Sequence, residues 1–273
     1  MGKLRACSAV AMLALAACGS DSKTPDAAII IIDAPTPDAE TFFDAPPPNY
    51  DLSCLNGTPP TTAEDPVTIA GTTTTLSNSG TPSPVGDVAV DVFVIGETDP
   101  VASVTSNSSG AFTTPSIATG AEPLAGYIRA GKAAHRTTYL YPPTLITASL
   151  TGVPVPLVSN AQFVQIDMFL NQDDNVNGLL LVIVTDCSAG LTPVAGASLA
   201  VKQDNSDVGQ VLDVGQFIPE AAGTFFVANV PDGEAQVTVT YNGTAWPTRT
   251  VHAYARGKSA EATTTVVPVR PGP

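Results

Sequence analysis

The sequence is poor in charged and aromatic residues and in the residues that bind metals. Charged residues make up 13% of the 273 residues and aromatic residues 6%, and there are only two histidines. A zinc hydrolase commonly needs two His and a Glu, but the residue three positions after each His is Thr138 or Ala255. Neither a glycine-rich phosphate loop nor a GxSxG elbow is present. The sequence therefore predicts a protein that is not an enzyme.

Basic residues are also scarce, with 11 Lys and Arg against 25 Asp and Glu and a formal net charge of −14. A chain this acidic is repelled by phosphate backbones and by anionic membrane surfaces. We therefore expect no nucleic-acid partner, and any attachment to a membrane must come from something other than charge.

Long hydrophobic runs are missing as well. Lys3 and Arg5 precede a short apolar stretch at 9–17, and the later run at 29–32 holds only four isoleucines. A helix that crosses a bilayer takes roughly 20 apolar residues. Residues 1–17 are therefore predicted to be a signal peptide, not a membrane span.

The leader ends in Leu15-Ala16-Ala17-Cys18, which resembles the lipobox of bacterial lipoproteins. The resemblance implies cleavage before Cys18, a lipid on its sulfur, and anchoring in the cell envelope, with the outer membrane as the expected location. Two or more acyl chains, at about 0.8 kcal/mol per buried CH₂, hold a protein stably to a membrane. The alternative is an ordinary secretory signal with a chance cysteine.

Residues 18–64 form a predicted tether. The segment is rich in proline and aspartate, and the phrases PDA and DAP each occur twice. Proline cannot donate to a strand ladder and repeated carboxylates repel one another, so we expect a disordered, extended chain. A short strand at 28–32 is the alternative.

The remainder has the pattern of short strands. The total of 25 prolines and 22 glycines favours frequent turns, and 86–95, GDVAVDVFVI, alternates valines with Asp87, Ala89 and Asp91. Residues 178–186, GLLLVIVTD, are apolar without alternation, which is typical of a strand buried on both faces. An all-β fold is predicted.

An internal repeat divides this part. PVGDV at 84–88 corresponds to PVAGA at 193–197, and 108–120 aligns without gaps with 221–233. The predicted units are 65–155 and 178–273, joined by a connector at 156–177. Within it, SNAQFVQIDMFLN at 159–171 has a helical stripe behind a Ser cap, although it also alternates as a strand would. We favour a short helix.

The phrases PVAGASLAV, GTFFVANVPDGEAQVTVTY and TTTVVPV resemble the carboxypeptidase regulatory-like domain, a transthyretin-like β-sandwich. The resemblance is good for 178–269 and weaker for the first unit, which lacks the second glycine of PVAGA and ends in the unusual YLYPPTLIT. It implies two Greek-key, Ig-like sandwiches in tandem and a non-catalytic role at a cell surface.

Two sets of side chains are candidate binding sites. Tyr139 and Tyr141 would share one face of an extended segment and, with Trp246, could stack against a sugar or peptide, although core packing is the alternative. A second set follows the first half of a calcium loop and consists of Asp173, Asn175 and Asn177. Position twelve of that loop is a valine, so a polar turn is the alternative, and we expect no other cofactor.

Two of the four cysteines could pair. Cys7 leaves with the leader and Cys18 carries the lipid, so Cys54 and Cys187 remain as a candidate disulfide or as two free thiols. The function that these features predict is a non-catalytic envelope lipoprotein that displays two sandwiches as a spacer or a ligand- or partner-binding unit. The alternative is an accessory protein that binds a glycan or peptide and works with a separate hydrolase.

Overall fold

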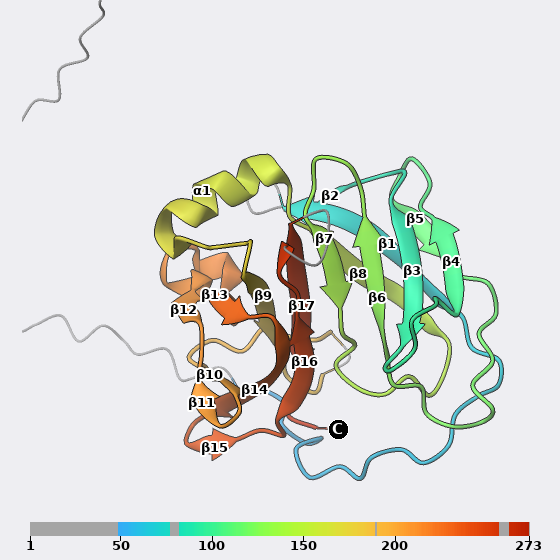
Figure 1. The fold of residues 1–273 in the computed structure, drawn as a ribbon. Helices are drawn as coiled ribbons and strands as arrows, with labels where there is room; N and C mark the ends of the chain where they lie inside the picture. Colours follow the sequence, from blue (N-terminus) through green and yellow to red (C-terminus); the bar gives the residue numbers. More distant parts are fainter. Residues whose placement is uncertain (1–48, 77–81, 189, 257–261, 273) are drawn as a thin grey trace, which may run out of the picture. The chain divides into compact units, whose positions relative to one another are not determined.

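Strands dominate the part of the chain that the computed structural model describes, residues 49–272 without 77–81, 189 and 257–261 (Figure 1). The predicted signal peptide, Cys18 and most of the predicted tether lie outside these residues. The strands are β1 (Ile69–Leu76), β2 (Pro82–Pro84), β3 (Ala89–Val94), β4 (Ala102–Thr105), β5 (Ala111–Thr113), β6 (Gly126–Gly131), β7 (Thr137–Leu140), β8 (Leu150–Leu157), β9 (Asn177–Val184), β10 (Ser198–Gln203), β11 (Ser206–Asp207), β12 (Gln210–Asp213), β13 (Thr224–Pro231), β14 (Gly233–Tyr241), β15 (Thr244–Ala245), β16 (Arg249–Ala253) and β17 (Thr263–Val269). One α-helix, α1 (Asn160–Leu170), and two short 3₁₀ helices, η1 (Val214–Gln216) and η2 (Pro219–Ala221), complete the described elements. The all-β prediction is confirmed.

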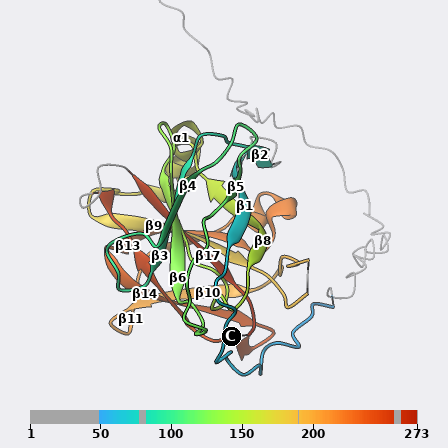
Figure 2. The same cartoon turned by 90° about the vertical axis from the view of Figure 1, so that its right-hand side faces the viewer.

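The strands form three sheets. An eight-stranded central sheet runs in the order β12-β13-β9-β17-β7-β6-β3-β4. A four-stranded sheet of β2, β1, β5 and β8 lies on one side of its β3, β6 and β7 half, and a five-stranded sheet of β11, β10, β14, β15 and β16 lies across its β9 and β17 half (Figures 1 and 2). The architecture is therefore sandwich-like, with the central sheet common to both sandwiches.

The last strand joins the two predicted units. β17 pairs in parallel with β9 on one side and with β7 on the other. Its residues are buried on both faces, with Val266 in the core on one side and Val267 in the core on the other, as a central parallel strand requires. Residues 49–273 consequently form one compact unit, in which 65–155 and 178–273 share a sheet.

Side-chain alternation distributes the apolar residues between two cores. In β3 and just before it, Val88, Val90 and Val92 are buried in the first core. In β9, Leu179 and Leu181 belong to the first core whereas Leu180, Val182 and Val184 belong to the second. The half-buried strand and the strand buried on both faces are thus confirmed.

Helix α1 lies in the predicted connector. Ser159 caps it, since its hydroxyl accepts from the Gln162 N–H at 3.2 Å while the Gln162 side chain accepts from the Ser159 N–H. Phe163 and Leu170 are buried against the first core, and the helix ends at Asn171 in the left-handed conformation. The predicted short helix is confirmed. No helix in the described residues is long and apolar enough to span a bilayer.

Candidate functional site: an aromatic groove

Aromatic rings gather on the face of β3, β6 and β7 that points away from the four-stranded sheet. Phe93 of β3 is the register partner of Tyr127 of β6, and Arg129 of β6 is that of Tyr139 of β7. Directly opposed residues of antiparallel strands put their side chains on the same face, about 5 Å apart. The pairing therefore builds a row of side chains across the sheet.

Strand β16 and the residue after it supply the opposite wall. The Tyr139 ring stacks on the Tyr254 ring with centroids 3.9 Å apart. The His252 ring lies 4.3 Å from the Tyr254 ring. Within the row, the Tyr127 ring lies 5.2 Å from Phe93 and 5.4 Å from Tyr141. We call the surface formed by Phe93, Tyr127, Tyr139, Tyr141, His252 and Tyr254 the aromatic groove.

Phenol hydroxyls link the two walls. The His252 N–H donates to the Tyr141 hydroxyl at 3.2 Å, and the Tyr254 hydroxyl bonds with Tyr141 and Tyr127. Burial raises the pKa of the Tyr141 phenol, and burial, with the neighbouring Tyr141, raises the pKa of Tyr254 still more strongly. Both phenols therefore keep their protons at neutral and mildly alkaline pH and can donate hydrogen bonds.

A charged pair borders the row. Arg129 lies 5.0 Å above the centre of the Phe93 ring and contacts the Asp91 carboxylate at 2.7 Å. The Ser103 hydroxyl donates to the same carboxylate at 2.7 Å. The Arg129 side chain is 44% exposed, so it is the group at this border that an approaching ligand would meet first.

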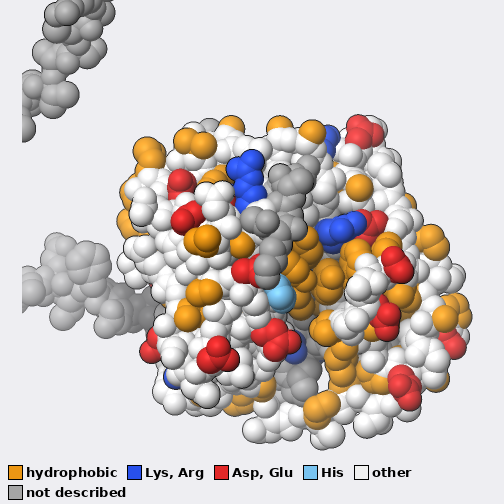
Figure 3. All heavy atoms as spheres, in the orientation of Figure 1, with side chains coloured by type: hydrophobic (Ala, Val, Ile, Leu, Met, Phe, Trp, Pro, Cys, Tyr) orange, Lys and Arg blue, Asp and Glu red, His pale blue; other side chains and the backbone are white. Residues whose placement is uncertain are grey.

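The groove is hollowed at one end. A cavity of about 140 Å³ lies between Tyr141 and Pro142 on one side and Arg249, Thr250 and Val251 of β16 on the other. Figure 3 shows hydrophobic side chains along a hollow in the middle of this face, with acidic and basic side chains around it. The groove therefore places apolar rings beside groups that donate and accept hydrogen bonds.

The three predicted stacking residues all belong to the second core, where Tyr139, Tyr141 and Trp246 are 9%, 8% and 3% exposed. Tyr139 and Tyr141 come together in the groove, where they are buried beneath the more accessible Tyr127 and Tyr254. Trp246 lies in the second core, 3% exposed, and its backbone N–H donates to Val239. Core packing, the alternative for all three, is the finding, although Tyr139 and Tyr141 also form the base of the groove.

Several groove residues are not predicted from the sequence. For one of them, Phe93, the sequence contains a pattern that indicates its role. Phe93 lies on the same face of the 86–95 strand as Ala89 and Asp91, opposite the buried valines. An aromatic residue among polar outward positions indicates a covered or ligand-binding patch. His252 and Tyr254 come from a distant strand, and no local pattern places them beside Tyr139.

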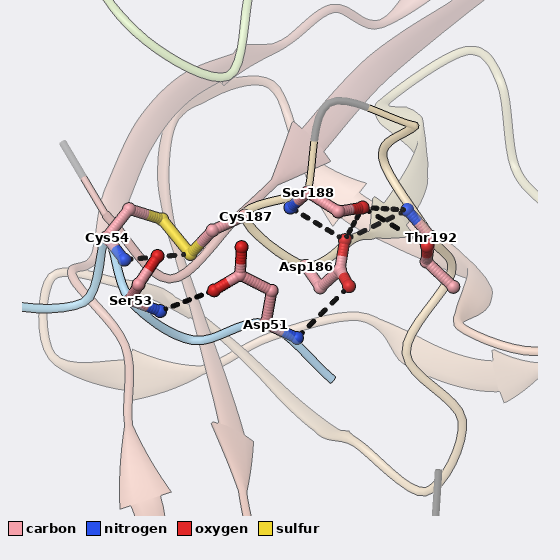
Figure 4. Close-up of a disulfide and its surroundings, with 7 residues drawn as sticks. All are labelled: Asp51, Ser53, Cys54, Asp186, Cys187, Ser188 and Thr192. Atoms are coloured by element: carbon pink, nitrogen blue, oxygen red, sulfur yellow. Dashed lines mark hydrogen bonds between the residues drawn. A yellow bond between two sulfur atoms is a disulfide. The ribbon is translucent and has the colours of Figure 1, made fainter. Parts of the chain in front are cut away.

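Cys54 and Cys187 form a disulfide, with Cα atoms 5.8 Å apart (Figure 4). Beside the bridge, the Asp186 carboxylate accepts from the Asp51 N–H at 3.2 Å, and from the Ser188 hydroxyl and the Thr192 N–H. Burial acts to raise the pKa of Asp186, but these hydrogen bonds together hold it below its usual value. The end of the predicted tether is thereby fastened to the loop that follows β9.

The candidate calcium ligands are engaged in a turn. Asp173 accepts from the backbone and side-chain N–H groups of Asn175 at 3.1 and 3.2 Å, whereas Asn177 donates to Asn229 at 3.4 Å. Within the described ranges, no three His, Cys, Asp or Glu side chains cluster as metal ligands. The structure therefore keeps all three residues in one turn, because the Asn177 N–H donates to the Asp173 carbonyl at 3.0 Å and both residues donate to the Asn229 side chain.

The neighbouring Asp174 has a role that the sequence did not indicate. It accepts from Arg136 through two hydrogen bonds of 2.7 and 2.6 Å. Arg136 is 1% exposed, donates also to Thr263 and Thr264 at the start of β17, and stacks on Phe163 at 3.9 Å. This ion pair joins β7, β17 and the segment between α1 and β9.

No family model matches the chain, and no curated protein matches it. Solved structures that match include a cohesin–dockerin complex from Acetivibrio cellulolyticus (16% identity, 34% of this chain and 58% of that chain, TM-score 0.24). A streptococcal ancillary pilin matches with 11% identity over 76% of this chain and 63% of that chain (TM-score 0.22). The major pilin BcpA of Bacillus cereus matches with 12% identity over 75% and 59% (TM-score 0.22). This chain spans less than two thirds of each of these structures, and at such TM-scores the matches assign neither family nor function.

Proposed function

We propose that this chain is a non-catalytic lipoprotein of a bacterial cell envelope and that its aromatic groove binds a saccharide of that envelope. The lipid anchor is supported by the leader and Cys18. The observation that carries the binding proposal is the groove itself, in which rings from β3, β6, β7 and β16 surround hydroxyl groups that keep their protons.

A sugar ring matches the two kinds of surface in the groove. Its C–H faces pack on aromatic rings, and its hydroxyls exchange hydrogen bonds with phenols and a guanidinium. Tyr127 and Tyr254 are half-buried and Arg129 is exposed, so these three would contact the ligand. Tyr139 and Tyr141 support them from below.

The Asp91 and Asp232 carboxylates lie at the groove, and both are engaged, which supports a binding role over a catalytic one. Asp232 accepts from the Ala255 N–H at 2.9 Å and lies 4.0 Å from His252 Nε2. A glycosidase needs a pair of carboxyl groups that flank the scissile bond, one of them free to exchange a proton. Asp91 is instead held by Arg129 and Ser103. Its function is to orient the guanidinium above Phe93.

The test is retention of the purified chain on insoluble envelope polysaccharides, followed by affinity electrophoresis with the fraction that retains it. We expect Tyr127→Ala and Arg129→Ala each to weaken retention about tenfold, the loss that corresponds to 1.4 kcal/mol of stacking or cation–π contact. Tyr127→Phe keeps the ring but removes the hydroxyl, so it should weaken retention by less than Tyr127→Ala does. Phe217→Ala, which removes an exposed ring elsewhere on the surface, is the matched control.

Two outcomes would contradict the proposal. If no envelope polysaccharide retains the chain, or if Tyr127→Ala binds as well as Phe217→Ala, the groove is not a saccharide site and a role as spacer is favoured. The anchor is tested separately by mass spectrometry of the N-terminus of the protein from its native membranes. An unmodified Cys18, or retention of Met1, would refute lipidation.

A further inference from the structure

A second cavity lies on the other face of the central sheet. It measures about 540 Å³, within the range of about 300–1,000 Å³ typical of ligand pockets. Ile69, Ile128 and Leu140 form its buried floor between the four-stranded and the central sheets, and Pro154 and Leu191 lie at its exposed rim. It is thus an open pocket rather than a gap enclosed in the core.

The backbone of β8 explains why the sheets leave this space. Opposite Ile69 and Gly71 of β1, the register of β8 shifts between Leu150 and Val153. Gly152, in this shift, has a φ of +69°, a conformation that favours glycine. Such a bulge bends a strand locally, and here it lies beside the pocket.

The walls are apolar and stiff. Five of the lining residues are prolines, Pro142, Pro143, Pro154, Pro193 and Pro268, and the first two are the paired prolines of the unusual YLYPPTLIT segment. Proline has a fixed φ and no N–H to offer, so these five residues give the walls a pre-formed backbone without donors of their own. Among the described residues, no charged side chain lines the pocket.

One buried polar group in the lining has no partner. Thr185 follows β9, on the same side of the strand as Leu181 and Ile183, and is 6% exposed. Its backbone is fixed, since its N–H donates to Val269 at 2.9 Å, but its hydroxyl has no hydrogen-bond partner among the described residues. A buried hydroxyl without a partner is costly and rare in native proteins, and a ligand group would satisfy it.

We infer that this pocket binds an uncharged lipid with a single acyl chain, whose ester carbonyl or hydroxyl pairs with the Thr185 hydroxyl. The apolar walls accept the chain. A free carboxylate is disfavoured because the pocket has no cation to compensate a buried charge. The site lies beside Asp186 and Cys187, where the predicted tether is fastened to the folded part.

The experiment titrates the purified full-length chain with 1-monolauroylglycerol and, separately, with laurate, below the micelle concentration of each, by isothermal titration calorimetry. We expect the neutral ester to bind at least about tenfold more tightly than the anion. Thr185→Val should weaken binding of the ester about fivefold, the value of one hydrogen bond. The same variant should raise the Tm of the ligand-free protein, because it removes the unpaired hydroxyl.

Two further variants make the test specific. Thr185→Ser keeps the hydroxyl and should keep the affinity, and Thr151→Val, at the exposed rim of the same pocket, should change neither affinity nor Tm. The inference fails if the ester does not bind, if laurate binds equally well, or if Thr185→Val leaves both the affinity and the Tm unchanged. Binding to a Cys18→Ser chain but not to the lipidated chain would overturn the free-lipid occupant and assign the pocket to the protein's own acyl chain. None of these outcomes depends on saccharide binding in the aromatic groove.

Discussion

Asp174→Asn should destabilise the fold more than any other single charge removal at a described ion pair. The side chain keeps its shape, but it loses its charge and presents one oxygen where Arg136 donates twice. Arg136 is 1% exposed and cannot turn toward water. Its remaining acceptors are Thr263 and Thr264, which are neutral.

The magnitude follows from this geometry. A hydrogen bond to a charged group contributes about 1.5–3 kcal/mol, so loss of one bond and weakening of the other amounts to about 3 kcal/mol. Removal of one partner of a buried ion pair typically costs about 3–5 kcal/mol. Asp174 is 20% exposed and water can partly replace it, which places the expected loss at the lower end of that range.

Urea denaturation at neutral pH measures the loss as a change in the free energy of unfolding. Arg136→Met combined with Asp174→Asn should recover much of it, since no buried charge is then left unpaired. Asp207→Asn is the matched control, because its contact with Lys202 is 3.8 Å long and exposed, and it should change stability by less than about 0.5 kcal/mol. A loss below about 1 kcal/mol for Asp174→Asn, or a double variant no more stable than the single one, would refute the reasoning.

Three other predictions concern the disulfide and the titrating groups. Replacing Cys54 and Cys187 by serine should lower the free energy of unfolding by up to about 5 kcal/mol, because the bridge closes a loop with a sequence separation of 133; urea denaturation without reductant measures this, and a loss below about 1 kcal/mol would contradict it. Tyr141 and Tyr254 have raised pKa values in the fold, so the stability that they contribute is present below about pH 10 and is lost as the pH rises further. The tyrosinate absorbance of Tyr141 and Tyr254 should then appear only when the protein unfolds. A rise of their absorbance near pH 10 while the fold is intact would contradict the raised pKa values. Asp186 has a lowered pKa, so its contribution is present above about pH 4 and is lost as the pH falls; Asp186→Asn should weaken the acid dependence of Tm, and an unchanged acid dependence would count against it.

The parts of the fold that could be predicted are those that local periodicity determines. Alternating valines at 88, 90 and 92 and the continuous run of β9 indicated which faces would be buried, and the Ser159 cap indicated the helix. These patterns depend only on the geometry of one strand or one helix. They do not state which strand will be the neighbour.

The neighbours of the last described strand, β17, could not be predicted from a local pattern. The letters TTTVVPV indicate a strand, but nothing in them says that β17 lies between β7 and β9. The aromatic groove shows the same limit, because alternation could place Tyr139 beside Tyr141 but could not bring Tyr254 from the end of β16. Residue type alone groups Trp246 with these tyrosines, and residue type does not determine position in the fold.

The place of β17 has a consequence for how the protein is made. The leader at 1–17 predicts an exported chain, and an exported chain emerges N-terminus first. β17, which fills the middle of the eight-stranded sheet, is the last of the described strands to arrive, and until it does β7 and β9 each lack a neighbour. Contacts between such distant segments form slowly. The central sheet can therefore close only after β17 has been delivered, and the open edges of β7 and β9 must be kept from pairing with other chains until then.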